Sequence, residues 1–561
     1  MKKTIILILG LMVGMQYAAL ACTNFLITKG ASTDGSTMIS YAADSHVLYG
    51  ELYYFPAADY KAGDMLKVYE WDSGKYLGEI PQISHTYQVV GNVNEHQVAI
   101  GETTYGGRPE LVDTTAILDY GSLIYIALQR SKTAREAIKV ITDLIALYGY
   151  YSSGESFSIA DKNEVWIFEM IGKGPGNKGA VWVARLVPDG YVCAHANQAR
   201  ITTFEYQKKN KWDDPNANTF NSPDVISFAR SKKYFSGKDE EFSFSDTYAP
   251  VDFSAARFCE IRVWAFFNSV TDGMDKYWDY AKGHIEHGAN GYATNRMPLW
   301  VKPTKKIGVL DVMAYMRDHL ENTELDMSKD AGAGPFGCPY RWRPLTWQVD
   351  GQTYLNERAT ATQQTGFSFV AQMRSWLPDK VGCINWFSVD DAACTVYMPI
   401  YCGIAKVPYP IAHGNGSMME FSDESAFWIF NQVSNFAYTR WNSIYPEIKG
   451  LQYDLEKGFT KETAVIDSKI ANMKSISDAE ITDIVTQYSV TAVEMTFKTW
   501  KKLYSDLFVK YMDGNIKEKN PVPDNYLYVT PSVKQPGYSY SFLKNIVDET
   551  KDKLKVVGPA H

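Results

Sequence analysis

Residues 22–39, C-T-N-F-L-I-T-K-G-A-S-T-D-G-S-T-M-I, decide the fold of this chain. The first six residues after the cysteine are rich in β-branched and aromatic side chains and predict a strand, and residues 37–41 predict a second strand. The turn-forming residues S-T-D-G lie between them at 32–35. The pattern therefore predicts a hairpin that opens at Cys22 and holds this cysteine rigidly at a sheet edge.

The segment before this hairpin looks like an export signal. Two lysines precede an apolar run over residues 5–13, and the small-residue motif A-L-A follows at 19–21. The run is shorter than the ~20 apolar residues that a bilayer span needs, and no later stretch approaches that length. We therefore expect residues 1–21 to be a signal peptide that is cut directly before Cys22. The mature protein is then exported, to the periplasm or the extracellular space.

A cysteine at the first mature position has three interpretations. It could carry a lipid anchor, but Ala19 and the bulky Leu20 fit the lipidation pattern poorly, and no flexible polar tether follows the cysteine. It could be an ordinary terminal residue. It could also be a nucleophile whose own α-amine, with an unperturbed pKa of about 7.7–8.0, serves as its base. The rigid hairpin favours this catalytic interpretation of Cys22.

The composition argues against several other classes of protein. The 561 residues are 45% apolar and 21% charged, which predicts a globular chain with a large core. A net charge of -8 without a basic stripe argues against nucleic acid as a partner. The seven cysteines form no C-x-x-C pair that would indicate zinc, and we expect neither a metal nor an organic cofactor. Three of them lie close together in the sequence: Cys383, Cys394 and Cys402. A disulfide among them and buried free thiols are both compatible with the sequence.

Further motifs follow the hairpin in a fixed order. They are N-E-H-Q-V-A-I-G-E-T-T at 94–104, A-N-Q-A-R-I at 196–201, P-L-W-V at 298–301, G-A-G-P-F-G-C-P-Y-R-W-R-P at 332–344 and F-W-I-F-N-Q-V-S-N-F-A-Y at 427–438. Together they resemble the cysteine-type dipeptidases of the N-terminal nucleophile (Ntn) hydrolases, the PepD and secernin group. The resemblance implies an α+β fold, in which helices cover two stacked antiparallel sheets in an αββα sandwich. It also implies that an N-terminal cysteine hydrolyses short peptides.

The secondary-structure pattern is compatible with such a sandwich. Two hairpins are expected, over residues 157–170 and 181–195. Thr133 and Glu136 predict a capping box that begins a helix ending near Gly149.

The second half of the chain contains the remaining predicted helices. Helices are expected at 309–320, at 423–443 and throughout 461–512, with a second capping box where the last segment restarts at Ser477. The tail from residue 520 carries Pro521, Pro523, Pro531 and Pro536, which predict a loop and not another helix. We expect three parts of the chain: a signal peptide (1–21), a catalytic domain (22–460) and a helical C-terminal extension (461–561).

The resemblance also implies roles for side chains on the second strand. Related Ntn amidases carry an arginine near the thiol and an aspartate that holds the α-amine. The acidic position falls on Asp44. The alternative interpretation of this residue is an ordinary carboxylate at the surface. The arginine position falls on Tyr41, which carries no charge, so the thiolate would have less electrostatic support and substrate choice would differ.

Oxyanion stabilisation and substrate binding need further groups. Asn197 is the side-chain candidate for the oxyanion, although a turn asparagine is the alternative, and a backbone N–H near Thr103 is the second donor. Glu102 is a candidate for the free amine of the substrate. The substrate carboxylate needs a cation, for which three arginines stay open: Arg200, Arg262 and Arg296.

The sequence therefore predicts an exported dipeptidase that acts through a thioester on Cys22. Two alternatives stay open: an Ntn amidase acting on non-peptide acyl amides of the penicillin or bile-acid conjugate type, and a lipid-anchored surface binding protein without catalysis. The expected partners are short peptide substrates, with no nucleic acid and no membrane segment after signal removal. Whether the protein is a homo-oligomer is left open.

Overall fold

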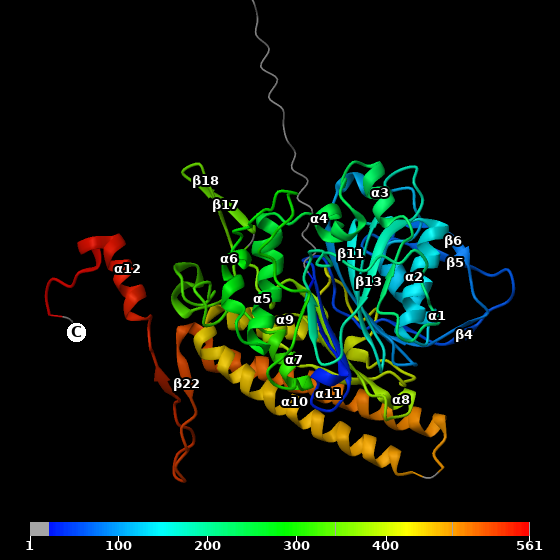
Figure 1. The fold of residues 1–561 in the computed structure, drawn as a ribbon. Helices are drawn as coiled ribbons and strands as arrows, with labels where there is room; N and C mark the ends of the chain where they lie inside the picture. Colours follow the sequence, from blue (N-terminus) through cyan, green and yellow to red (C-terminus); the bar gives the residue numbers. More distant parts are fainter. Residues whose placement is uncertain (1–21, 343, 474, 560–561) are drawn as a thin grey trace, which may run out of the picture.

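Two large antiparallel sheets form the centre of the molecule (Figure 1). The computed structural model describes residues 22–342, 344–473 and 475–559, so the predicted signal peptide lies outside the described residues. The first sheet has seven strands in the order β16 (Trp300–Val301), β14 (Val192–His195), β1 (Asn24–Ile27), β2 (Thr37–Asp44), β19 (Thr365–Met373), β20 (Cys383–Val389) and β21 (Met398–Tyr401). The second has eight, in the order β15 (Thr219–Asn221), β13 (Ala180–Leu186), β12 (Val165–Gly172), β11 (Gly154–Ala160), β10 (Ala99–Gly106), β9 (Val93–Asn94), β8 (Val89–Val90) and β3 (Tyr54–Phe55).

The second sheet is apolar on both faces because it separates two cores. Alternate residues of β12 point to opposite sides. Val165 and Ile167 belong to the core that the second sheet shares with the first, whereas Trp166 and Phe168 belong to a core under helices. A sheet that is buried on both faces in this way needs a layer on each side of it. The fold is therefore a mixed α+β architecture.

Two helices cover the outer face of the second sheet: α1 (Tyr120–Arg130) and α2 (Ala134–Tyr148). Thr133 Oγ1 accepts the N–H of Glu136 at 3.1 Å, which caps the start of α2, and the helix ends at Gly149 in the left-handed region with φ 81°. The predicted start and end of this helix are confirmed, but the capping box is only half formed, because Glu136 Oε2 accepts the N–H of Lys132 at 2.7 Å and not that of Thr133.

Three helices pack on the outer side of the first sheet: α9 (Ala426–Thr439), α10 (Trp441–Ala471) and α11 (Asp478–Tyr511). Buried polar contacts fasten α10 to this sheet, since Asp467 forms an ion pair with Arg374 and accepts the Tyr401 hydroxyl at 2.8 Å. Ser477 and Glu480 form the predicted capping box. The predicted domain boundary at 460 falls inside α10, and the division into a catalytic domain and an extension stays a prediction.

Several predicted elements differ from the structure. The hairpin over 157–170 is confirmed as β11 and β12, but the one over 181–195 is wrong, because β13 pairs within the second sheet and β14 within the first. Both strands are buried on both faces, so their pattern carried no information about their partners. The hairpin after Cys22 is confirmed, but β1 lies between β14 and β2 and is not an edge strand.

The helical predictions also need correction in three places. The helix expected at 309–320 is shorter, α7 (Val309–Tyr315), the one expected at 423–443 is divided at Arg440 between α9 and α10, and α10 and α11 are separate helices. The tail contains β22 (Ile516–Glu518), β23 (Ser532–Lys534) and also a helix, α12 (Tyr540–Thr550). These four prolines all lie before Ser539, whose hydroxyl caps α12, so they did not exclude the helix. α12 buries none of its residues and projects away from the sheets (Figure 1).

Two further predictions concern disulfides and membrane-spanning segments. All seven cysteines are free thiols, so the predicted alternative of a disulfide among Cys383, Cys394 and Cys402 is not present in the structure. Within the part of the chain that is described, no helix combines the length and the apolar character that a bilayer crossing requires.

Candidate active site

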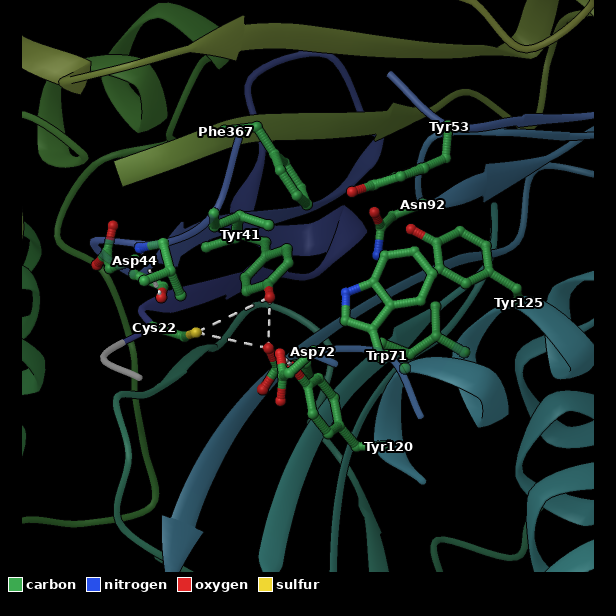
Figure 2. Close-up of a pocket in the computed structure, with 17 residues that line it drawn as sticks. Cys22, Tyr41, Asp44, Tyr53, Trp71, Asp72, Asn92, Tyr120, Tyr125 and Phe367 are labelled. Atoms are coloured by element: carbon green, nitrogen blue, oxygen red, sulfur yellow. Dashed lines mark hydrogen bonds between the residues drawn. The ribbon is translucent and has the colours of Figure 1, made fainter. Parts of the chain in front are cut away.

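Cys22 lies in the wall of a cavity of about 340 Å³ at the rim of the two sheets (Figure 2). The residue directly after it, Thr23, exchanges backbone hydrogen bonds with Ala42 of β2 at 3.0 and 3.3 Å. The cysteine itself is only 4% exposed. The sheet therefore fixes the backbone of Cys22 and leaves its sulfur to face the cavity.

The nitrogen of Cys22 is held by Asn197. In the full-length chain this atom is a peptide nitrogen, and it stands where an α-amine would lie if the chain began at Cys22. It donates to Asn197 Oδ1 at 2.8 Å, and the Nδ2 group of Asn197 donates to the carbonyl of Thr104 at 2.7 Å. Asn197 has a φ of 65°, in the left-handed region that asparagine tolerates better than most residues. Its predicted role at the oxyanion stays a prediction.

Arg262 is the arginine that the fold brings to Cys22. It belongs to α5 (Ile261–Val270) and is 1% exposed. Its guanidinium donates to the carbonyl oxygen of Cys22 at 2.6 Å, to Thr23 Oγ1 at 2.8 Å and to Asn197 Oδ1 at 2.9 Å. Burial, together with the nearby Arg358, lowers the pKa of Arg262 to about 10, so the group still carries its positive charge at neutral pH. Of the three arginines left open by the sequence, this one contacts the nucleophile candidate.

The sulfur of Cys22 faces an acidic and phenolic wall. Its Sγ lies 3.5 Å from Glu102 Oε1 and 3.8 Å from the Tyr41 hydroxyl, which in turn donates to Glu102 Oε1 (Figure 2). Burial raises the pKa of the Cys22 thiol well above its usual value, and Glu102 and Asp44 raise it further. The thiol is therefore protonated at rest and needs a base to become a nucleophile.

Glu102 is one half of a buried carboxyl pair. Burial raises the pKa values of both Glu102 and Glu155, and Glu102 raises that of Glu155 well above its usual range. Glu155 thus keeps its proton beside Glu102, while its Oε2 accepts the Thr104 hydroxyl at 2.9 Å. This arrangement explains how two carboxyl groups share one dry site next to the thiol.

Asp44 lies in the same cavity wall, so the alternative of a surface carboxylate is wrong. Its carboxylate forms an ion pair with Arg358 and accepts the Thr365 hydroxyl at 2.6 Å. Burial raises its pKa, while Arg358 opposes the shift. The nitrogen of Cys22 donates to Asn197 rather than to this carboxylate, and the predicted contact between Asp44 and the amine stays a prediction.

Three other predicted residues lie outside this cavity. Thr103 follows Glu102 on β10 and points to the opposite side, where its hydroxyl contacts His195 Nδ1 at 2.8 Å. The two remaining arginines form buried ion pairs of their own, Arg200 with Glu260 at 3.0 Å and Arg296 with Asp246 at 3.2 Å. The structure therefore joins Cys22, Tyr41, Asp44, Glu102 and Asn197, and places Arg200 and Arg296 elsewhere.

The sequence analysis missed part of the cavity wall. A surface hairpin of β5 (Met65–Tyr69) and β6 (Tyr76–Pro81) carries Trp71 and Asp72 at its turn. The Tyr120 hydroxyl, from the first residue of α1, donates to Asp72 Oδ1 at 2.8 Å. Nothing in the local sequence indicates this contact, because it depends on how the hairpin docks on a distant helix.

The fold and the site define a class of enzyme, in which a buried cysteine faces an acidic cavity at the rim of two antiparallel sheets. The model described as Peptidase family C69 matches residues 21–53 and 51–454. The chain belongs to this family of cysteine peptidases.

Curated relatives with modest identity point in the same direction. A protein of Salmonella dublin named "Probable dipeptidase" is 24% identical over 407 residues, which cover 69% of this chain and 82% of the relative. One of Latilactobacillus sakei with the same name is 22% identical, with 85% and 94% covered. "Probable dipeptidase B" of Streptococcus pyogenes serotype M1 is 22% identical, with 90% and 96% covered.

Proposed function

We propose that the protein is an exported dipeptidase of the N-terminal nucleophile type, which uses Cys22 as both nucleophile and base. One observation carries the proposal: the sulfur and the nitrogen of Cys22 are both held at one site, the nitrogen by Asn197 and the sulfur against Tyr41 and Glu102. The names of the relatives and two facing antiparallel sheets covered by helices support it. Export would remove residues 1–21 and free the α-amine.

In the proposed reaction the α-amine of Cys22 takes the thiol proton, and Sγ attacks the carbonyl carbon of the peptide bond. The C–N bond then breaks as the α-ammonium gives its proton to the leaving amine, which leaves a thioester. Water hydrolyses the thioester with the same amine as base and restores the thiol. Arg262 supports this cycle as a nearby positive charge that fixes the backbone carbonyl of Cys22.

The free α-amine is the part of this proposal that is tested most directly. We expect the intact mass of the exported protein to correspond to a chain that begins with an unmodified Cys22. We expect dipeptides to be hydrolysed, and Cys22→Ser to lower kcat by about 10³-fold or more, because a hydroxyl is a far weaker nucleophile than a thiol. Cys338→Ser, which changes a thiol outside the cavity, is the matched control and should keep its activity.

The other expected functions give different results. A diacylated Cys22 contradicts the mechanism, because an acylated amine cannot accept a proton. A protein that cleaves acyl amides but no dipeptide is an amidase instead. A chain that retains one extra residue before Cys22 should be nearly inactive, and full activity in that variant would contradict the role of the amine.

A further inference from the structure

We infer that Asp72 binds the α-ammonium group of the dipeptide and so makes the enzyme selective for free N-termini. This inference rests on the proposed dipeptidase function and assigns one part of the substrate to one residue. The argument starts from geometry. The α-nitrogen of a peptide lies about 2.5 Å from the carbonyl carbon of the same residue. When Sγ of Cys22 attacks that carbon, the ammonium must therefore lie in the same cavity as Sγ.

Three acidic side chains line that cavity, and two of them are already engaged. Asp44 is bound by Arg358 and Thr365. Glu102 Oε1 accepts both the Tyr41 hydroxyl and the thiol, and Glu102 Oε2, which accepts no hydrogen bond from the described residues, is fully buried beside Glu155. At Asp72, by contrast, Oδ1 accepts the Tyr120 hydroxyl, and Oδ2 accepts no hydrogen bond from the described residues. Asp44 and Glu102 are each only 1% exposed, whereas Asp72 is exposed, so Asp72 is the carboxylate of the three with an accessible oxygen for a ligand.

The structure holds Asp72 in place through its neighbours. The backbone N–H of Trp71 donates to Asp119 Oδ2 at 2.9 Å, and the same carboxylate caps α1 by accepting the N–H of Ser122. The Trp71 ring packs where a Cβ on Gly121 would lie, 2.4 Å from its Cγ atom, so only glycine permits this close approach. Asp72 is therefore a fixed carboxylate at the turn of a well-anchored hairpin.

The rest of the cavity also favours a donor ligand. No lysine or arginine is among the described residues that line it. Asn92 lines it too, is 2% exposed, and its Oδ1 accepts no hydrogen bond within the described part of the chain. The aromatic rings of Tyr53, Trp71 and Tyr125 lie around Asn92 in this cavity (Figure 2). Such a cavity suits an ammonium group at Asp72 and the first side chain of the peptide among the rings.

The test compares an apolar dipeptide with its des-amino analogue, in which hydrogen replaces the α-ammonium. We expect the wild-type enzyme to hydrolyse the dipeptide and to hydrolyse the des-amino analogue only poorly. Asp72→Asn should raise KM for the dipeptide about 10- to 100-fold with kcat changed less than about threefold, and should abolish the preference for the free amine. Tyr120→Phe keeps the charge but loses its positioning hydrogen bond and should raise KM only a few-fold.

The matched control is Glu70→Gln. Glu70 belongs to the same turn, where its carboxylate accepts the N–H of Ser73 at 2.8 Å, and it does not line the cavity. It should keep the wild-type KM and preference. If Asp72→Asn retains the preference for the free amine, the inference about Asp72 is wrong, while the proposed dipeptidase function is unaffected. A wild type that hydrolyses no dipeptide overturns the proposed function, and the inference with it.

Discussion

The two sides of Cys22 differ sharply in charge. On the sulfur side, the cavity wall contains Glu102 and Asp72 and no basic group among the described residues. On the nitrogen side, Asn197 and Arg262, which contact Cys22, also line a second cavity of about 420 Å³, together with Arg358 and the acidic Asp252. A dipeptide carries a positive charge at one end and a negative charge at the other. In the proposed reaction, this difference in charge therefore favours one direction in which the substrate lies across the nucleophile.

Removing the basic side should have the largest effect. Arg262→Gln removes a buried charge and leaves the carbonyl of Cys22 and the hydroxyl of Thr23 without their donor. We expect the free energy of unfolding to fall by about 3 kcal/mol, because buried acceptors that lose their donors cost about 1–3 kcal/mol each. We expect kcat to fall about 100-fold through the loss of electrostatic support. Urea denaturation and steady-state kinetics measure the two effects.

Arg262→Lys is the control for this substitution. It keeps the charge but not the planar fork, so part of kcat should return while the unfolding free energy stays below that of the wild type. A wild-type kcat in Arg262→Gln would show that the basic side does not act on the nucleophile.

The acidic side should be visible in the pH dependence. Burial raises the pKa of Asp72 to about 6, the Tyr120 hydroxyl opposes the shift, and the neighbouring carboxylates Glu70, Glu102 and Asp119 add to it. Only ionised Asp72 can balance an ammonium group, so kcat/KM for dipeptides should rise with pH through a midpoint of about 6. This limb should be absent in Asp72→Asn, and in Glu70→Gln it should remain but move to lower pH, because Glu70 raises the pKa of Asp72.

Tyr120→Phe gives the sharper form of this test. Loss of the hydroxyl removes a contact that lowers the pKa of Asp72, so the midpoint should move to higher pH. A midpoint that stays in place in both Tyr120→Phe and Asp72→Asn would assign the limb to another group.

The carboxyl pair behind the acidic side should affect stability more than turnover. The pKa of Glu155 is raised well above its unfolded value of about 4.5, so the folded state keeps a proton that the unfolded state loses. Stability therefore falls as pH rises above 4.5, until the folded-state pKa is reached. Glu155→Gln has no titrating group at this position. As pH rises, its free energy of unfolding should therefore increase relative to that of the wild type by about 1.4 kcal/mol per pH unit. Denaturation at pH 5, 6 and 7 measures this, and parallel curves would contradict it.

The sequence was most informative where contacts are local. The strand pattern after Cys22 and the capping residues Thr133 and Ser477 predicted elements that the structure contains. Cys22 itself was found from the A-L-A motif that precedes it. These features depend on residues within a few positions of one another, and such signals are visible without tertiary structure.

The remaining parts of the site depend on contacts between distant segments. Arg262 lies 240 residues from Cys22, and nothing in its local sequence separates it from Arg200 and Arg296. Asp72 is a turn residue whose position is set by α1. The strand β14 was paired with β13 in a predicted hairpin, whereas it pairs with β1 and β16, because strands buried on both faces look alike in sequence. Long-range pairing therefore limits what the sequence alone can predict.

The hairpin that carries Trp71 and Asp72 separates chemistry from recognition within one cavity. Cys22, the proposed nucleophile, lies just before β1, and its neighbours Tyr41 and Glu102 belong to β2 and β10 of the two large sheets, where substitutions disturb a shared core. The hairpin is a separate two-stranded ribbon at the surface, and surface connections tolerate changes of length and sequence. Exchange of the turn residues 70–75 alone, with Val68 and Ile80 kept in the core, would therefore retune which peptides are accepted, both during evolution and by protein engineering, without rebuilding the catalytic framework.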